Sequence, residues 1–125
     1  MQNEKTSFSA VLGVVLSNLR KSKGVEQGDM AARMGLSQPS YSRLESGKSA
    51  FSVDQMFQAA KALGTTFEEL NTRLIHNIEE LQANGIEVVQ PVRGNTSKAQ
   101  KQGNEMGQLV AGAALGALLF SLLTK

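Results

Sequence analysis

Residues 27–47 read QGDMAARMGLSQPSYSRLESG and contain two short helical patterns separated by a glycine. The first pattern runs to Met34, and Gly35 stops it at a position suited to a left-handed backbone. Ser37 then stands two residues before Pro39, which is typical of an N-cap followed by the first turn of a helix. Two short helices joined by a glycine-containing turn form a helix-turn-helix, so the stretch predicts this motif.

Helical periodicity continues on both sides of this stretch. Apolar residues recur at helical spacing before it, in residues 8–19, and after it, in residues 53–63 and 67–81. A glycine follows each of these segments, and Thr66 with Glu69 three residues later has the spacing of a capping box. Together with the quoted stretch, these patterns predict five helices and an all-α fold class.

The composition of the chain changes after the fifth helix. Residues 1–85 contain the five helical patterns and are expected to form one unit. The next segment is residues 86–105. Its first part, residues 86–92, predicts a short strand, which Pro91 places at the edge or end of a sheet. The rest of this segment is rich in Gly, Asn, Gln, Ser and Lys and predicts a flexible linker. Residues 106–125 are expected to form an apolar C-terminal helix.

The C-terminal segment is compatible with two interpretations. A helix over 106–123 would be roughly 27 Å long, just short of a hydrocarbon core of about 30 Å, so it is a candidate membrane anchor. Its apolar character all round leans toward the membrane, but assembly with a second copy or with a protein partner also buries it. Gly112 and Gly116 form a small-xxx-small pattern that permits close helix packing in either setting.

Composition argues against an enzyme. The 125 residues include no Cys and a single His, His76, which removes cysteine nucleophiles, thiolate zinc sites and His-pair metal sites. The chain also has no glycine-rich phosphate loop, and the adjacent Glu79 and Glu80 are expected to form a solvated helix face. We therefore expect no catalytic residue, no cofactor and no bound metal.

The charge is unevenly distributed along the chain. The net charge is only +2, but basic residues outnumber acidic ones in residues 17–48, and the reverse holds in residues 49–92. Such a distribution concentrates positive potential around the helix-turn-helix, which favours a polyanionic partner.

The second helix of the motif has polar side chains suited to reading bases. Leu36, Tyr41 and Leu44 are expected to anchor it, so that its other face can enter the major groove of double-stranded DNA. Gln pairs with adenine and Arg with guanine through two hydrogen bonds each, whereas Ser and Lys more often hold phosphate. The side chains left on the outward face are those of Gln38, Pro39, Ser40, Ser42 and Arg43.

Several sequence marks along the chain fall at mutually compatible spacings. They are Leu19-Arg20-Lys21, Gln27, Met30-Ala31, Gly35-Leu36-Ser37, the run from Ser42 to Lys48, and Ala62-Leu63-Gly64. On these marks the chain resembles the lambda-repressor-like, Cro-type helix-turn-helix family, also called the XRE family, over roughly residues 8–70. The resemblance implies a five-helix domain that binds operator DNA as a dimer.

The resemblance also implies two sets of DNA contacts. The base-reading residues would be Gln38, Pro39, Ser42 and Arg43. The phosphate-binding residues would be Arg20, Gln27, Ser40, Ser46 and Lys48. We therefore expect a sequence-specific transcriptional regulator, a repressor, that binds DNA through the recognition helix 38–46.

Three positions qualify this expectation. Glu26 stands where the family usually has a Ser or Thr cap, and Gly28 weakens its helix by about 1 kcal/mol relative to alanine. Glu45 is expected to form a structural ion pair, with Arg20 or Arg33, and to make no contact with DNA.

A second function class remains open at this point. The helical domain could bind a protein partner as an adaptor or antitoxin, tethered or assembled through the C-terminal helix. We expect no N-terminal secretory signal, because residues 8–19 fit a helix of the fold. We therefore expect a cytoplasmic domain, with the C-terminal helix as a candidate anchor in the inner membrane.

Overall fold

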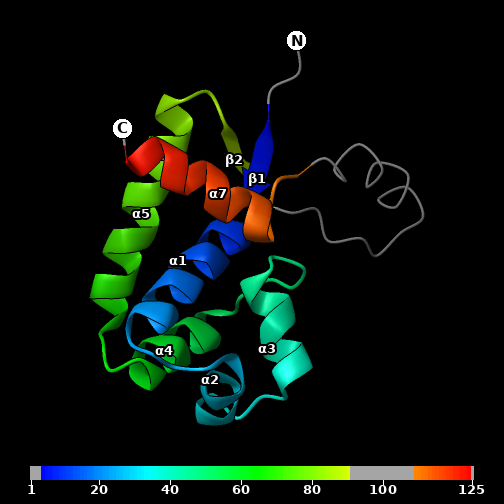
Figure 1. Cartoon of the computed structure of the whole chain (residues 1–125), viewed down its shortest axis with the longest axis vertical. Helices are drawn as coiled ribbons and strands as arrows, with labels where there is room; N and C mark the ends of the chain where they lie inside the picture. The colour runs from blue at the N-terminus through cyan, green and yellow to red at the C-terminus, as the bar shows by residue number, and fades with distance from the viewer. Residues whose placement is uncertain (1–3, 91–108, 125) are drawn as a thin grey trace, which may run out of the picture.

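The computed structural model describes residues 4–90 and 109–124 of the chain. In chain order the elements are β1 (Lys5–Ser7), α1 (Phe8–Ser22), α2 (Gln27–Arg33), α3 (Gln38–Glu45), α4 (Val53–Ala62), α5 (Phe67–Ala83), β2 (Glu87–Val89) and α7 (Gly112–Leu123). Figure 1 shows α1 in the middle of the molecule, with α5 along one side and α7 across its upper end. The five expected helices, α1 to α5, are confirmed, together with the mainly helical fold class.

The helix boundaries follow local sequence signals. The N-caps of α1, α3, α4 and α5 each accept a hydrogen bond from the backbone N–H three residues later, and they are Ser7, Ser37, Ser52 and Thr66. Gly35 has φ +71°, which lets the chain reverse tightly between α2 and α3. The helix-turn-helix is therefore built from local signals that the sequence displays.

The capping box expected at Thr66 forms only in part. Thr66 accepts a hydrogen bond from the Glu69 N–H, but the Glu69 carboxylate pairs with Arg73 one turn later at 3.2 Å. The complete capping box lies at the start of α4, where Ser52 and Gln55 exchange both bonds. The basic residue four positions after Glu69 competes for its carboxylate, and the prediction was wrong to that extent.

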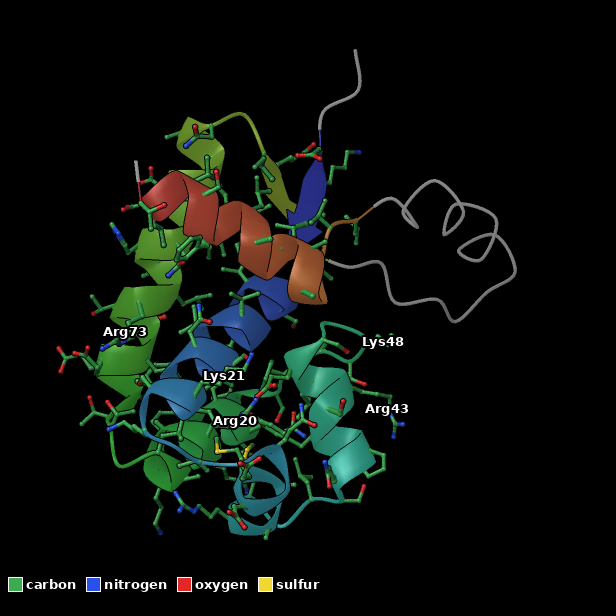
Figure 2. All side chains as sticks on the ribbon, in the orientation of Figure 1. Arg20, Lys21, Arg43, Lys48 and Arg73 are labelled. Carbon is green, nitrogen blue, oxygen red and sulfur yellow. The ribbon has the colours of Figure 1, made fainter. Side chains whose placement is uncertain are left out.

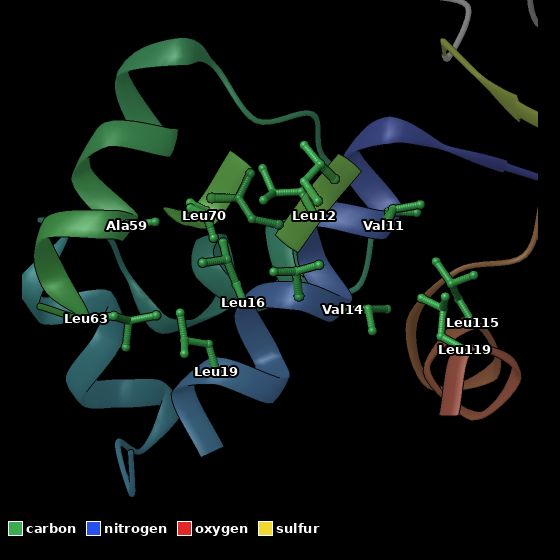
Figure 3. Packing of buried hydrophobic residues seen from close by; sticks show 14 of the residues in the cluster. Val11, Leu12, Val14, Leu16, Leu19, Ala59, Leu63, Leu70, Leu115 and Leu119 are labelled. Atoms are coloured by element: carbon green, nitrogen blue, oxygen red, sulfur yellow. The ribbon is translucent and has the colours of Figure 1, made fainter. Parts of the chain in front are cut away.

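The hydrophobic core is organised around α1. This helix contacts α3, α5 and α7 on different sides, so most of its side chains are buried. Figure 3 shows Leu12 and Leu16 of α1 among residues of α4 and α5, including Leu70. Burying such an aliphatic side chain stabilises the fold by about 1.5–3 kcal/mol. The elements of the helix-turn-helix are thus held against one common helix.

The approach of α3 to α1 depends on Gly13. A Cβ placed on this residue would lie 2.9 Å from the carbonyl oxygen of Leu44 and would overlap the carbonyl oxygen of Glu45. Only glycine leaves room for the backbone of α3 at this distance. The contact fixes the C-terminal end of α3 relative to α1.

The short strand predicted after α5 is confirmed as β2, although its partner was not foreseen. β2 pairs in parallel with β1, with Thr6 opposite Val88. The residues of the predicted strand beyond 90, and the predicted linker over 93–105, lie outside the described residues. The division of the chain at residues 85 and 105 stays a prediction.

The C-terminal helix packs on its own domain, and its expected roles as a membrane anchor or an assembly helix stay predictions. Residues 109–111 are not helical, residues 106–108 lie outside the described part, and α7 spans only Gly112–Leu123. Leu115 and Leu119 are buried against the domain itself, facing Val11 and Val14 of α1 (Figure 3). Two leucines four positions apart give α7 one face that fits this site.

Membrane spanning was one interpretation of this segment. Within residues 4–90 and 109–124, no helix combines the length and the apolar character needed to cross a bilayer. The small-xxx-small pattern is not used for close packing at Gly116, because a Cβ there would meet no atom within 4 Å.

Candidate nucleic-acid interface

The expected base-reading residues lie on one accessible face of α3. Tyr41 and Leu44 are buried and hold the helix against α1 and α2. Gln38, Pro39 and Arg43 are exposed, and Ser40 and Ser42 are partly exposed. Figure 2 shows Arg43 and Lys48 projecting away from the body of the protein on the same side.

Arg43 is poorly satisfied within the protein. One guanidinium nitrogen lies 3.4 Å from the hydroxyl oxygen of Ser40, a long hydrogen bond at an exposed position. No described carboxylate forms an ion pair with this guanidinium. The remaining N–H groups of the planar guanidinium are therefore available to an acceptor outside the protein.

A buried polar cluster supports α3 from behind. The Glu45 carboxylate accepts two hydrogen bonds from Arg20, at 2.8 and 3.0 Å, and one from the Tyr41 hydroxyl at 2.6 Å. The Gln27 amide donates a further bond to it at 3.0 Å. The cluster joins α1, the first residue of α2 and the C-terminal end of α3, so it sets the orientation of the recognition helix.

The pKa values of the cluster follow from this geometry. Burial alone raises the pKa of the Glu45 carboxyl, but the hydrogen bonds from Arg20, Tyr41 and Gln27 outweigh it and leave the pKa below its usual value. The hydrogen bond to Glu45 raises the pKa of Arg20, and burial followed by the hydrogen bond to Glu45 raises that of Tyr41. Glu45 and Arg20 are therefore both charged at neutral pH.

The ion pair of Glu45 was expected with Arg20 or Arg33, and the structure shows Arg20. Arg33 instead donates to the carbonyl oxygen of Ala62 at 2.9 Å. Arg20 also donates to the carbonyl oxygen of Val25 at 2.8 Å, which fixes the loop before α2.

Two of the expected phosphate contacts thus lie deeper than the sequence suggested. The Arg20 side chain is buried, and three of its N–H groups are used inside the protein. Gln27 is partly buried, and its side-chain amide donates a hydrogen bond to the Glu45 carboxylate. The sequence pattern locates these residues near the interface, but their internal hydrogen bonds depend on the tertiary fold.

The other expected phosphate contacts follow α3 or lie on its surface. Ser46 is the C-cap of α3, its hydroxyl donates to the carbonyl oxygen of Arg43 at 3.3 Å, and Lys48 is exposed in the loop beyond it. The Ser40 hydroxyl accepts a hydrogen bond from that of Ser37 at 3.0 Å. Lys21, which precedes the end of α1, is exposed.

The two departures from the family pattern have different structural consequences. Glu26 is the N-cap of α2 and its side chain makes no capping bond, as expected from the missing Ser or Thr. A Cβ on Gly28 would lie 3.3 Å from the side-chain oxygen of Gln38. Gly28 therefore leaves space for Gln38 at the junction of α2 and α3.

Comparison with known proteins agrees with this architecture. A family model described as Helix-turn-helix matches residues 16–70. An uncharacterized HTH-type transcriptional regulator of Sinorhizobium fredii is 37% identical over 62 residues, which cover 50% of this chain and 80% of that protein. The crystal structure of the clp gene regulator ClgR from C. glutamicum has a TM-score of 0.54 at 24% identity, covers 57% of this chain and 92% of its own, and supports the fold.

The family assignment rests on the Sinorhizobium fredii relative, most of whose length this chain covers, and on the matched segment. The matched residues include α2, α3 and the buried cluster that orients them. The chain therefore belongs to the lambda-repressor-like, XRE-type helix-turn-helix family of DNA-binding transcriptional regulators.

Proposed function

We propose that the protein is a sequence-specific repressor that binds operator DNA as a dimer, with α3 in the major groove. The observation that carries this proposal is the contrast between the two faces of α3. Its inner face is fixed by Tyr41, Leu44 and the Glu45 cluster, whereas its outer face has Gln38 and Arg43 in solvent. A fixed helix with free polar side chains is what direct readout in the groove requires.

The proposed roles differ between residues. Arg43 donates two hydrogen bonds to a guanine, Gln38 pairs with an adenine, and Pro39 and Ser42 lie against neighbouring base edges. Ser40, Ser46 and Lys48 hold phosphates and set the register. In this proposal Arg20 and Gln27 act mainly by holding α3 through Glu45, in addition to the phosphate contacts that the family resemblance implies.

An apolar patch on α4 supports the dimer. Val53 and Phe57 lie four residues apart on α4 and are 65% and 53% exposed. The Phe57 ring stacks on that of Phe67 of α5, with ring centroids 4.3 Å apart. Exposed apolar surface of this kind is typical of contacts between proteins, and a second copy would cover it. A two-fold dimer positions two recognition helices one turn of DNA apart, and the bound dimer excludes polymerase in the cytoplasm.

The division of roles predicts different effects for two cationic side chains. Arg43→Ala should weaken binding to a preferred duplex by about 1–3 kcal/mol and relax sequence preference, because a base contact is lost. Lys48→Ala should weaken binding to preferred and random duplexes alike and reduce the salt dependence, because a phosphate contact is lost. Both effects are measured by gel shift with the two duplexes over a range of salt.

The wild-type protein and a Lys61→Ala variant serve as controls, since Lys61 is exposed on α4 and belongs to neither proposed contact set. If Arg43→Ala and Lys48→Ala change affinity without any difference in preference, the proposed roles are wrong. Absence of DNA binding even at low salt would instead favour a protein-binding adaptor.

A further inference from the structure

A cleft of about 550 Å³ is lined by residues of α1, α3 and α7. Gly112, at the start of α7, lies beside Ser46, at the end of the recognition helix: a Cβ on Gly112 would be 3.6 Å from the Ser46 carbonyl oxygen. Figure 1 shows α7 lying across α1 next to this end of α3. The C-terminal helix therefore borders the proposed DNA-binding surface directly.

One wall of the cleft includes residues from that surface. Gln27, Ser42 and Ser46 line it, and all three belong to the proposed contact sets. Asn18 and Lys21 of α1 extend the same wall, and no described carboxylate pairs with Lys21. A sugar-phosphate strand that follows α3 in the groove has to pass over these side chains.

Among the described residues, the opposite wall has no cationic side chain. It is formed by α7, where Gly116, Phe120 and Leu123 face the cleft. Phe120 is 70% exposed and Leu123 is 42% exposed. α7 contains no charged residue, so a phosphate pressed against this wall would lose water and gain no cationic partner from the helix.

The docking of α7 rests on two fully buried leucines, on the partly buried Leu118 and Leu122, and on the residues just before the helix. Only Leu115 and Leu119 of this helix are fully buried. At its N-terminal side, the Val110 N–H donates to the Lys5 carbonyl oxygen at 2.7 Å, and the Thr6 hydroxyl donates to the Val110 carbonyl oxygen. A terminal helix held in this way can undock and dock again while the rest of the domain stays folded.

We propose that docked α7 covers the edge of the DNA-binding surface and has to move away before a duplex seats fully on α3. Docking of the helix then lowers the affinity for DNA, and any event that releases the helix raises it. This regulation rests on the function proposed above, because it acts on the same surface.

A reversible crosslink tests the proposal. A Cβ on Gly112 would lie 3.9 Å from the Cβ of Ser46, within the range for a disulfide, and the chain has no other cysteine. Gly112 has φ +60°, so a cysteine there strains the backbone, and the two redox forms of one variant are therefore compared with each other. In the full-length double variant Ser46→Cys/Gly112→Cys, oxidation locks α7 in place and reduction frees it. We expect the oxidised form to bind a random 30-bp duplex, and a duplex selected from a random library, at least about fivefold more weakly than the reduced form.

A second pair of variants does not depend on the crosslink. Leu115→Asp/Leu119→Asp removes the buried contacts of α7, whereas Ala114→Asp/Ala117→Asp adds the same charge at exposed positions of the same helix. The first variant should bind DNA at least about fivefold more tightly than the second. Far-ultraviolet circular dichroism checks that both proteins keep their helices.

The outcomes separate the two proposals. Equal affinities within each pair, or tighter binding by the locked form, would show that α7 is not a cover, while DNA binding itself stands. If neither redox form nor the wild-type protein binds either duplex at low salt, the proposed function fails and the regulation fails with it. If the cysteine variant does not fold, the aspartate pair decides.

Discussion

Replacement of Glu45 by alanine should lower the free energy of unfolding by about 3–5 kcal/mol. The substitution leaves the Arg20 guanidinium buried without its partner, and it also removes the acceptor of the Tyr41 hydroxyl and of the Gln27 amide. A buried cation without a counter-ion costs far more than the ion pair contributes when it is intact. Urea denaturation followed by circular dichroism measures the change.

The control is Glu69→Ala, which removes the other ion pair in the described structure. Glu69 pairs with Arg73 at 3.2 Å, but both side chains are about half exposed. Exposed pairs contribute about 0–1 kcal/mol, so the expected loss is small. If the two substitutions cost the same, Glu45 does not have the structural role described above.

Acid should weaken the fold through the same carboxylate. Because its pKa is lower in the folded protein than the usual 4.5, the contribution of Glu45 is complete above that pH and is lost as the pH falls through the folded value. The Glu45→Ala variant lacks this contribution at every pH. Its stability should therefore fall less steeply than that of the wild type between neutral and acidic pH.

Gly13→Ala should destabilise the protein by at least about 3 kcal/mol, the upper end of the range for overpacking. The added methyl group would meet the backbone of α3 at the carbonyl oxygens of Leu44 and Glu45. Backbone atoms cannot rotate away as a flexible side chain does, so α3 has to shift. We expect DNA affinity to fall as well, because the shift disturbs the recognition helix.

Gly116→Ala is the matched control for this substitution. A Cβ at this position in α7 meets no atom within 4 Å, and alanine favours a helix by about 1 kcal/mol over glycine. Thermal denaturation should show a lower Tm for Gly13→Ala and an equal or higher one for Gly116→Ala. An unchanged Tm for Gly13→Ala would mean that α1 and α3 do not approach as closely as the structure indicates.

The parts of the fold that the sequence predicted are those encoded locally. Apolar periodicity, Ser and Thr caps and the glycine after α2 define the five helices, because each signal acts within a few residues. The outward face of α3 followed from the same pattern, once Tyr41 and Leu44 were taken as its inner face. The roles of the individual side chains on that face stay proposals.

The features that the sequence did not predict depend on contacts between distant segments. β1 has three residues, too few to show alternation, and its pairing with β2 joins the two ends of the helical unit. α7 is apolar all round, so periodicity could not indicate which face packs on α1. Gly13 gave no signal, because a glycine within a helix shows its purpose only when another backbone lies against it.

The most direct test of the central claim is selection of binding sites by the full-length protein from a random duplex library. We expect enrichment of two inverted half-sites whose centres lie about 10 bp apart. With Arg43→Ala, enrichment at one position of each half-site should disappear, because one base contact per protomer is lost. Binding of the wild-type protein to DNA with no enriched sequence would contradict the claim that α3 reads bases.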